Sequence, residues 1–494
     1  MHVKNSLKGS TIMETSIEIS EKKMNYSAFQ FILPFSIKSG SAPSFISALK
    51  NDNFERFQLD NPEMQHGYYG KFSIHHADIE HSFFPFINKI LFPPTENDAG
   101  FQRYSRSFNL SCSLIANKKT IPFTLLSADV VICPYELAFL TIRAEITDFS
   151  NIDFSTAIEF GTRFRVLEPG LSEDVETTIE HDTLRFGKVE NFIFNFLLPE
   201  VDSFIDKRES DGPRSYSIFD NKRMFVQSLF CLDSNESIEI VDVYRAGNLD
   251  GLDGKGNPYI SSSNSAYIHQ FVKENGYEKW APNTYYTIEK QNLTCLTNQS
   301  GMMLSRLASQ MYGKYYYGLL LNLFHRIVLL KIDILYSEVN IVRDEERVEK
   351  LIHFINTFTA NYLFIEITTQ SQGHEIFWRL RNKFKVETLY NDARQALNSL
   401  YKYQESFSSR KNNLLLLILT LYTVVGGIYG MNQVIEDLKG NIDLEKFLSY
   451  SVFEYIALFV TLSGLVVSIV LGVQGFIKWR KEIGKIKKWE AEEK

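Results

Sequence analysis

Two long apolar segments without a charged residue lie near the C-terminus, and they constrain the fold more than any other feature of the chain. They cover residues 414–430 and 455–477. At about 1.5 Å per residue, the first would form a helix of roughly 26 Å, close to the hydrocarbon thickness of a bilayer of roughly 30 Å. We therefore predict transmembrane helices at 414–432 and 455–477. A buried core helix is the alternative for either segment.

Charges around these segments predict their orientation. Arg410 and Lys411 precede the first segment, and the tail at 478–494 is rich in lysine. Basic residues collect on the cytoplasmic side of a membrane. We expect a multi-pass protein of the inner (plasma) membrane with both termini in the cytoplasm. The connecting loop, 433–454, would lie outside, where its carboxylates would attract cations. They include Glu436, Asp437, Asp443 and Glu445.

A heptad stripe precedes the first apolar segment. Its apolar residues recur at steps of three and four, which is typical of a helix in a left-handed bundle. They are Val386, Leu389, Ala393, Ala396, Leu400, Tyr403 and Phe407. Neither proline nor glycine interrupts the chain between Gly373 and Gly426. We predict one continuous helix whose part at 373–413 is a stalk that enters the membrane. The alternative is an ordinary amphipathic helix packed on its own domain.

A second stripe, most of whose residues are small or polar, runs beside the first at the same spacing. It consists of Ser406, Ser409, Asn413, Leu416, Thr420, Thr423 and Gly427. A polar line is costly in lipid and should face protein or water. Around the axis of an oligomer, this line would form rings of hydroxyl and amide groups in a pore. Hydrogen bonding between helices through Thr420 and Thr423 is the alternative.

The first apolar segment ends in the sequence Tyr429-Gly430-Met431-Asn432. Hydrated divalent cations, Mg²⁺ above all, release their water reluctantly. A ring of Asn432 carbonyls could hydrogen-bond to that water without removing it. Gly430 would let the backbone leave helical geometry at the pore mouth. Gly430, Met431 and Asn432 are therefore the predicted ion-selectivity residues.

In this context the chain resembles the CorA family, the two-transmembrane GMN proteins. The resemblance covers about residues 373–489 and is weak or absent before them. It implies a homopentamer with a cytoplasmic funnel, a long stalk helix in each subunit and a pore that conducts Mg²⁺ or a related divalent cation. It also places Thr423 and Gly427 at pore-facing positions. Ser406, Ser409 and Asn413 depart from the bulky apolar gate residues common in the family.

The preceding part of the chain predicts a folded cytoplasmic region. Short segments rich in aromatic and β-branched residues are typical of strands. They are 29–37, 107–115, 123–132, 137–146, 157–166 and 191–198. We predict an α+β fold with a flexible tail (1–24), a β-rich domain (25–300), a helical section (301–372), the stalk and two C-terminal transmembrane helices. The polar and aromatic stretch at 361–375 is either a connection between helices or part of a ligand-sensing surface.

Other motifs carry little chemistry. His75, His76 and His81 form a weak candidate metal site, because their spacing matches no common zinc pattern. Asp250 and Asp253 lie in a glycine-rich loop but lack the remaining ligands of a calcium loop, which favours a solvated turn. No nucleotide-hydrolase, serine-hydrolase or zinc-protease motif is present, so we predict neither catalysis nor a cofactor. The net charge of −7 gives no sign of nucleic-acid binding.

Three functions follow from these features. The first is a CorA-like, homo-oligomeric channel for divalent cations, most of all Mg²⁺. The second is a CorA-like effector of a bacterial CRISPR antiviral defence system, opened by a nucleotide messenger bound to the cytoplasmic domain. The third is a non-conducting membrane anchor for that domain.

Overall fold

The computed structural model describes residues 17–59, 68–72, 74, 79, 81–146, 148–170, 176–206, 223–340, 344–368, 370–430 and, with gaps, 448–480. The chain divides into two compact units. Unit 1 consists of Met1–Ile334 and Phe358–Asn391, and unit 2 of Leu335–Thr357 and Asp392–Lys494. Both units therefore use segments that are distant in the sequence, and α12, α13 and α15 each contribute residues to both.

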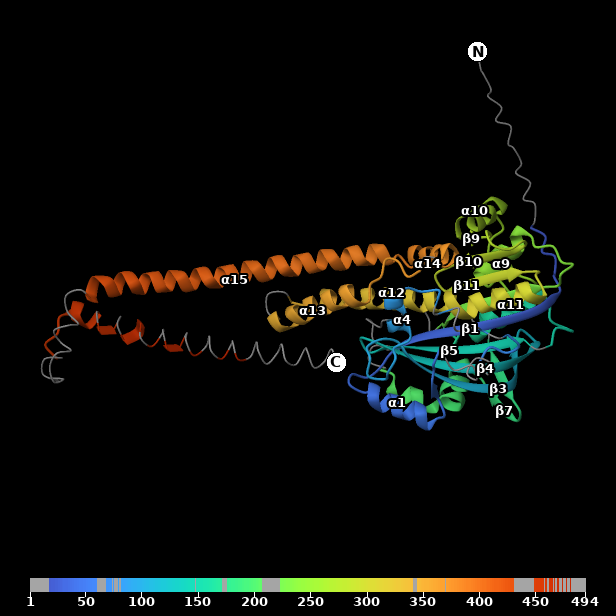
Figure 1. The fold of residues 1–494 in the computed structure, drawn as a ribbon, viewed down its shortest axis with the longest axis horizontal. Helices are drawn as coiled ribbons and strands as arrows, with labels where there is room; N and C mark the ends of the chain where they lie inside the picture. The colour runs from blue at the N-terminus through green and yellow to red at the C-terminus, as the bar shows by residue number, and fades with distance from the viewer. Residues whose placement is uncertain are drawn as a thin grey trace, which may run out of the picture. The chain divides into compact units, whose positions relative to one another are not determined.

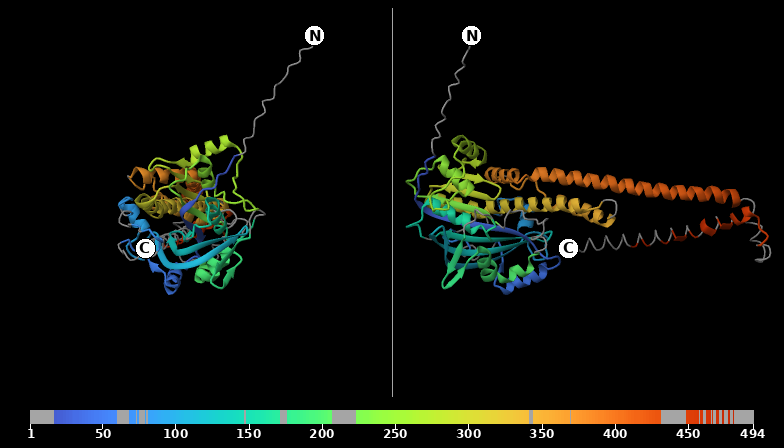
Figure 2. Two further views of the ribbon diagram at one scale, coloured as in Figure 1. Left: turned by 90° about the vertical axis from the view of Figure 1, so that its right-hand side faces the viewer. Right: turned by 180° about the vertical axis from the view of Figure 1, so that it is seen from behind.

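One large mixed sheet forms the centre of unit 1, with helices on both of its faces (Figures 1 and 2). Its strands are β1 (Met24–Ser36), β2 (Glu55–Arg56), β3 (Gln102–Ala116), β4 (Lys119–Cys133), β5 (Leu137–Ile146), β6 (Thr178–His181), β7 (Leu184–Phe186), β8 (Phe225–Leu232), β9 (Gly276–Tyr277), β10 (Thr284–Ile288) and β11 (Asn292–Thr297). The spatial order is β7-β6-β3-β4-β5-β1-β8-β11-β10-β9, with β2 paired to β3. Among the described strands, every pair is antiparallel except β8 with β11.

The helices of the described residues are mostly short before residue 300 and longer after it. They are α1 (Ala42–Asn51), α4 (Pro85–Leu91), α5 (Phe154–Phe164), α6 (Val189–Asn191), the π-helix η1 (Phe192–Leu197), α7 (Pro199–Phe204), α9 (Ile240–Asn248), α10 (Ser265–Asn275), α11 (Gly301–Gln310), the π-helix η2 (Met311–Tyr315), α12 (Tyr316–Glu338), α13 (Glu345–Asn361), α14 (Ser371–Lys383) and α15 (Val386–Gly430).

Four of the six predicted strands are present, as parts of β1, β3, β4 and β5. The other two are helices. Residues 157–166 fall mostly in α5, whose N-cap Asp153 accepts a hydrogen bond from the Thr156 amide at 2.8 Å. Residues 191–198 form the end of α6 and then η1. The aromatic side chains of both segments suggested strands. In the structure these side chains belong to helices that pack on the sheet, and a buried position favours aromatic residues in a helix as well as in a strand.

The apolar face of the sheet carries an aromatic-rich core. Alternate residues of its strands, such as Phe31 on β1, Val130 on β4 and Ile142 on β5, pack with apolar residues of α1, α5, η1 and α9. Phe164 of α5 lies with its ring centroid 4.5 Å from that of Phe31. The strands alternate as expected for an antiparallel sheet with one face toward a core.

The opposite face of the sheet is polar, yet it is also buried. Its residues include Arg103, Ser105, Ser127, Asp129, Thr141, Arg143, Gln30 and Gln227. Strand register places them side by side, since Ser105 lies opposite Asp129, Ser127 opposite Arg143, and Gln30 opposite both Arg143 and Gln227. We call this row the polar layer. The tyrosines of η2 and α12 cover it: the Tyr316 hydroxyl lies 2.8 Å from Thr141 Oγ1.

Asp129 joins the two arginines of the polar layer. Its Oδ2 lies 2.6 Å from Nη2 of Arg143 and 3.0 Å from Nη2 of Arg103. All three side chains are almost fully buried. Burial alone would raise the pKa of Asp129, but the two guanidinium charges outweigh that effect and hold the pKa below its usual value. The carboxylate is therefore charged near neutral pH and compensates part of the buried positive charge.

The predicted continuous helix from residue 374 onward is interrupted. α14 ends at Lys383, and α15 begins at Val386 after a turn in which Lys385 has a φ of 55°. A residue in the left-handed region can end a helix without proline or glycine, so neither of the usual helix breakers marks this boundary in the sequence. α15 has 45 residues and is about 68 Å long at helical rise.

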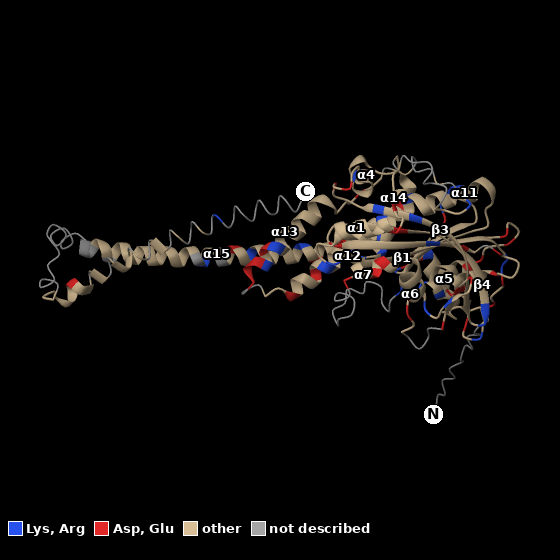
Figure 3. Cartoon of the chain, turned by 90° about the horizontal axis from the view of Figure 1, so that it is seen from below, with Lys and Arg blue, Asp and Glu red and all other residues tan. Residues whose placement is uncertain are grey.

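In the described part of the chain, no helix combines the length and apolar character that a membrane crossing requires. This finding corrects the predicted fold class with two C-terminal transmembrane helices, the multi-pass inner-membrane location and the description as a membrane ion channel. α15 is long, but its first half contains charged residues, visible in Figure 3, and is therefore not apolar. The second predicted span, at 455–477, is described only in part.

Candidate functional site

An open groove beside α14 is the candidate site of unit 1. It has a volume of about 670 Å³, within the range of roughly 300–1,000 Å³ typical of ligand sites. α14 forms one wall, and the end of α10 with the end of β10 forms the other. The lining residues are Glu274, Asn275, Ile288, His374, Glu375, Trp378, Arg379, Asn382 and Lys383. We call it the α14 groove.

The amphipathic pattern of α14 explains why these side chains face the groove. Ile376, Phe377 and Leu380 are buried, and their spacing places them on one side of the helix. Trp378, Asn382 and neighbouring polar residues occupy the other side, where they are exposed or partly exposed. Apolar burial therefore fixes the rotation of the helix and presents an aromatic and polar surface to the groove.

Two cations of α14 are held in place by contacts with the opposite wall. Lys383 Nζ lies 2.7 Å from Glu289 Oε1 and donates to Asn275 Oδ1 at 3.0 Å. Arg379 donates from Nη1 to the Gly276 carbonyl at 3.2 Å. A lysine has three N–H donors and an arginine five, so these bonds use only part of their capacity. Both groups are anchored and can still contact an anion.

The aromatic wall of the groove is oriented by a hydrogen bond within α14. Trp378 Nε1 donates to His374 Nε2 at 2.7 Å. Since that nitrogen accepts the bond, the neutral imidazole carries its proton on Nδ1. The pair lies at positions i and i+4, one helical turn apart. The indole ring is thus fixed and partly exposed, an arrangement in which a flat ligand could stack against it.

Acidic residues occupy the rim of the groove. Glu375 Oε1 lies 2.7 Å from Lys279 Nζ. Hydrogen bonds from Lys279 and then Tyr277 hold the pKa of Glu375 below its usual value. Its negative charge is therefore matched by Lys279, and the charge of Arg379 also lowers its pKa. Lys383 is paired with Glu289, so the groove offers an anionic ligand the remaining N–H donors of Arg379 and Lys383.

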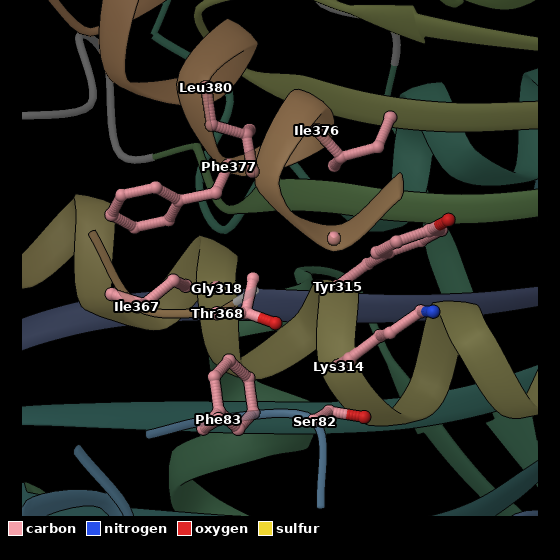
Figure 4. A pocket seen from close by; sticks show the side chains of 11 residues that line it. Ser82, Phe83, Lys314, Tyr315, Gly318, Ile367, Thr368, Ile376, Phe377 and Leu380 are labelled. Atoms are coloured by element: carbon pink, nitrogen blue, oxygen red, sulfur yellow. The ribbon is translucent and has the colours of Figure 1, made fainter. Parts of the chain in front are cut away.

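The small cavity on the buried side of α14 is a different feature (Figure 4). Its volume is about 10 Å³, at the lower limit of the space that one water molecule occupies. Phe83, Ile367, Phe377 and Leu380 supply apolar walls, and Lys314 and Thr368 supply polar groups. It is a packing gap rather than a ligand site.

The predicted pore stripe lies on α15. Ser406, Ser409, Asn413, Thr420, Thr423 and Gly427 are all exposed there. The Thr420 hydroxyl donates to the Leu416 carbonyl at 2.7 Å and that of Thr423 to the Leu419 carbonyl at 2.8 Å. Both hydroxyls are thus satisfied within their own helix. Their pore-lining role stays a prediction.

The heptad stripe that predicted a stalk is already largely buried within one chain. Ala393, Ala396 and Leu400 are buried in unit 2, as are Val348, Leu351 and Ile355 of α13. Asn356 of α13 donates from Nδ2 to the Tyr401 hydroxyl at 2.8 Å, which shows that the two helices meet. This favours the alternative of an amphipathic helix packed on its own chain over a stripe reserved for other subunits.

The remaining predicted residues divide into two groups. Gly430 ends α15, whereas Met431, Asn432, Glu436, Asp437, Asp443 and Glu445 lie outside the described residues. His75 and His76 also lie outside them, and His81 is exposed. Within the described ranges, no three histidine, cysteine, aspartate or glutamate side chains are grouped to hold a metal ion.

The glycine-rich loop at 248–263 is a structural element. Asp253 is exposed and caps a turn, accepting bonds from the Lys255 and Asn257 amides at 2.8 Å, which fits the predicted solvated turn. Asp250 differs, since it is buried and its Oδ2 accepts bonds from the amide and hydroxyl of Ser261. The missing side chain of Gly251 lets the loop pass directly against Glu159.

The sequence analysis identified only part of the α14 groove. The polar and aromatic stretch at 361–375 contains His374 and Glu375, but Trp378, Arg379, Asn382 and Lys383 follow it. The sequence feature that could have identified them is a tryptophan and two basic residues on the polar side of an amphipathic helix. The opposite wall comes from residues about a hundred positions earlier, which no local pattern could reveal.

The comparisons with known proteins add no identity. No protein-family model matches the chain, and neither does any curated protein. The resemblance to the CorA family therefore stays a prediction.

Proposed function

We propose that unit 1 is a ligand-sensing domain that binds a nucleotide in the α14 groove. One observation carries the proposal: a fixed, partly exposed tryptophan lies on the same helix face as two anchored cations and an amide. An indole can stack on a base, and arginine and lysine can bind phosphate oxygens. Asn275 and Asn382 add donors and acceptors for the base or ribose.

The position of α14 in the chain supports a sensing role. Only Phe384 and Lys385 separate this helix from α15, so a ligand that moves α14 acts directly on the start of α15. Of the three predicted functions, this proposal retains only one part of the second, the domain that responds to a nucleotide. It makes no use of membrane spans.

Binding to the full-length chain tests the proposal. ATP, AMP and the dinucleotide pApA would be titrated by isothermal calorimetry, with pyrophosphate as a probe that lacks a base. We expect at least one nucleotide to bind and pyrophosphate to bind more weakly. Trp378→Ala should weaken nucleotide binding about 5- to 150-fold, since stacking of a base on an aromatic ring contributes about 1–3 kcal/mol.

A matched tryptophan provides the control. Trp280 is 43% exposed and does not line the groove, so Trp280→Ala should leave the affinity unchanged. Arg379→Gln should weaken ATP more than a nucleoside without phosphate. If none of the nucleotides binds, or if Trp378→Ala and Trp280→Ala have equal effects, the α14 groove is not a nucleotide site.

Divalent-cation handling is a separate proposal that rests on Gly430, Met431 and Asn432 alone. It can be tested as Mg²⁺ binding by the full-length chain, which should be weakened by Asn432→Ala and unchanged by Asn412→Ala, an exposed position of α15 outside the predicted pore stripe. Equal Mg²⁺ binding by the parent chain and Asn432→Ala would reject a role for Asn432.

A further inference from the structure

Arg381 lies on α14 between the groove residues but faces the interior. Its neighbours Arg379, Asn382 and Lys383 line the groove, whereas Arg381 is 1% exposed. Its guanidinium carbon lies 5.8 Å from the ring centroid of Trp378, within the range of a cation–π contact. Arg381 therefore contacts the aromatic wall of the groove from the buried side.

The same guanidinium reaches three other elements. Its Nε donates to Glu387 Oε1 in the first turn of α15 at 2.6 Å. Its Nη1 donates to the Phe364 carbonyl, in the connection before α14, at 3.1 Å. Nη1 also lies 3.5 Å from His325 Nδ1 of α12. Burial lowers the pKa of His325 to about 3, with Arg381 adding to the effect, so the imidazole is neutral and does not repel the guanidinium at neutral pH.

The contacts of Arg381 are incomplete. Its Nη2 is buried and has no hydrogen-bond partner among the described residues. An unsatisfied buried donor costs about 1–3 kcal/mol, more when it is charged. Glu387, its carboxylate partner among the described residues, is 46% exposed and can leave without a large desolvation cost. A guanidinium with a spare donor and one exposed partner can exchange contacts when its surroundings shift.

We infer that Arg381 is a positioning residue that transmits occupancy of the α14 groove to the start of α15 through its ion pair with Glu387. The inference rests on the proposed function, in that the groove must receive a ligand. Filling the groove displaces Trp378 or α14, the guanidinium moves with them, and the pair with Glu387 changes. Two sites are coupled when both bias one two-state element, and here that element is the ion pair.

A covalent probe tests the coupling without knowledge of the ligand. Asn382 is exposed in the groove, whereas the four native cysteines are buried, so Asn382→Cys can be labelled selectively with a fluorescein maleimide. Amide hydrogen exchange over residues 387–400 is then compared with and without the label. The control label is placed at Ser44→Cys, which is exposed on α1.

The label at position 382 should change exchange over residues 387–400 about fivefold or more. In the Glu387→Gln background the same label should change it by no more than about twofold, as expected for independent sites. Arg381→Lys keeps the charge but loses the forked contact, and should also reduce the response.

The outcomes separate the coupling from the nucleotide proposal. An equal response with and without Glu387→Gln, no response in either background, or a response to the label on α1 would overturn the role of Arg381. Absence of nucleotide binding in calorimetry would reject the nucleotide and leave the labelling result intact.

Discussion

The two faces of the sheet in unit 1 are both buried but are stabilised by different physics. On the apolar face, Phe31, Val130 and Ile142 pack among aromatic rings, and the contribution follows the area removed from water. On the polar face, Asp129, Arg143 and Arg103 are stable only because each charge has partners. Imperfect packing costs an apolar residue part of its buried area, whereas loss of its counter-charge leaves a buried ion uncompensated.

Two buried carboxylates in the same unit show how much the partners matter. Asp129 has two guanidinium groups nearby, and its pKa is lowered. Asp242 in α9 is also buried, but Lys22 Nζ is 3.9 Å away and Glu239 adds a like charge. Burial therefore prevails and raises the pKa of Asp242 to about 6. Burial alone does not decide the charge state of a carboxyl group; its charged neighbours also do.

The largest effect is expected from removing the shared carboxylate of the polar layer. Asp129→Ala leaves Arg103 and Arg143 buried without their common counter-charge, and should lower the free energy of unfolding of unit 1 by about 3–5 kcal/mol. Guanidinium-induced unfolding followed by near-ultraviolet circular dichroism of the tyrosines measures it. A loss below about 1 kcal/mol would mean that the ion pairs are not formed in solution.

Changing the pH separates the two carboxylates. The folded pKa of Asp242 is raised, so its contribution is fully present below the unfolded pKa of about 3.9 and is lost as the pH rises through about 6. Asp242→Asn should remove a fall in stability on the order of 2–3 kcal/mol over that window. Thermal unfolding at a series of pH values is the measurement. An unchanged pH profile in Asp242→Asn would contradict the raised pKa.

The pH dependence of the stability contributed by Asp129 has the opposite sign to that of Asp242. The folded pKa of Asp129 is lowered, so the stability that it contributes is present above about 3.9 and is lost as the pH falls through the depressed folded value. In the acid range, the stabilities of the parent chain and of Asp129→Asn should converge. A constant difference between them down to pH 2 would mean that the carboxylate does not titrate with unfolding.

Neighbouring residues of β5 compare the two faces at the smallest scale. Thr141→Val removes the partner of the buried Tyr316 hydroxyl and should cost about 1–3 kcal/mol. Ile142→Val removes one methylene group from the apolar face and should cost about 0.5–1.5 kcal/mol. Chemical denaturation of both variants makes the comparison. If Ile142→Val is the more costly change, packing rather than hydrogen bonding dominates both faces.

The sequence by itself determined the elements with strong local patterns. Composition indicates strands such as β5, and periodicity indicates the helical character after residue 300 and the amphipathic helix that begins α15. Prediction from the sequence failed where one pattern is compatible with two kinds of secondary structure. The aromatic residues of α5 and η1 suit a strand or a buried helix equally well, and only the sheet beneath them decides.

Only the tertiary structure decided what the polar patterns mean. The alternation of Thr141, Arg143 and Glu145 with apolar residues would suit a sheet with one hydrated face, but α12 and η2 cover that face. The α14 groove joins residues about a hundred positions apart, and the αL conformation of Lys385 ends a helix that the sequence continues. Local sequence sets which surfaces are apolar, whereas the pairing of distant polar groups depends on contacts that form only in the folded chain.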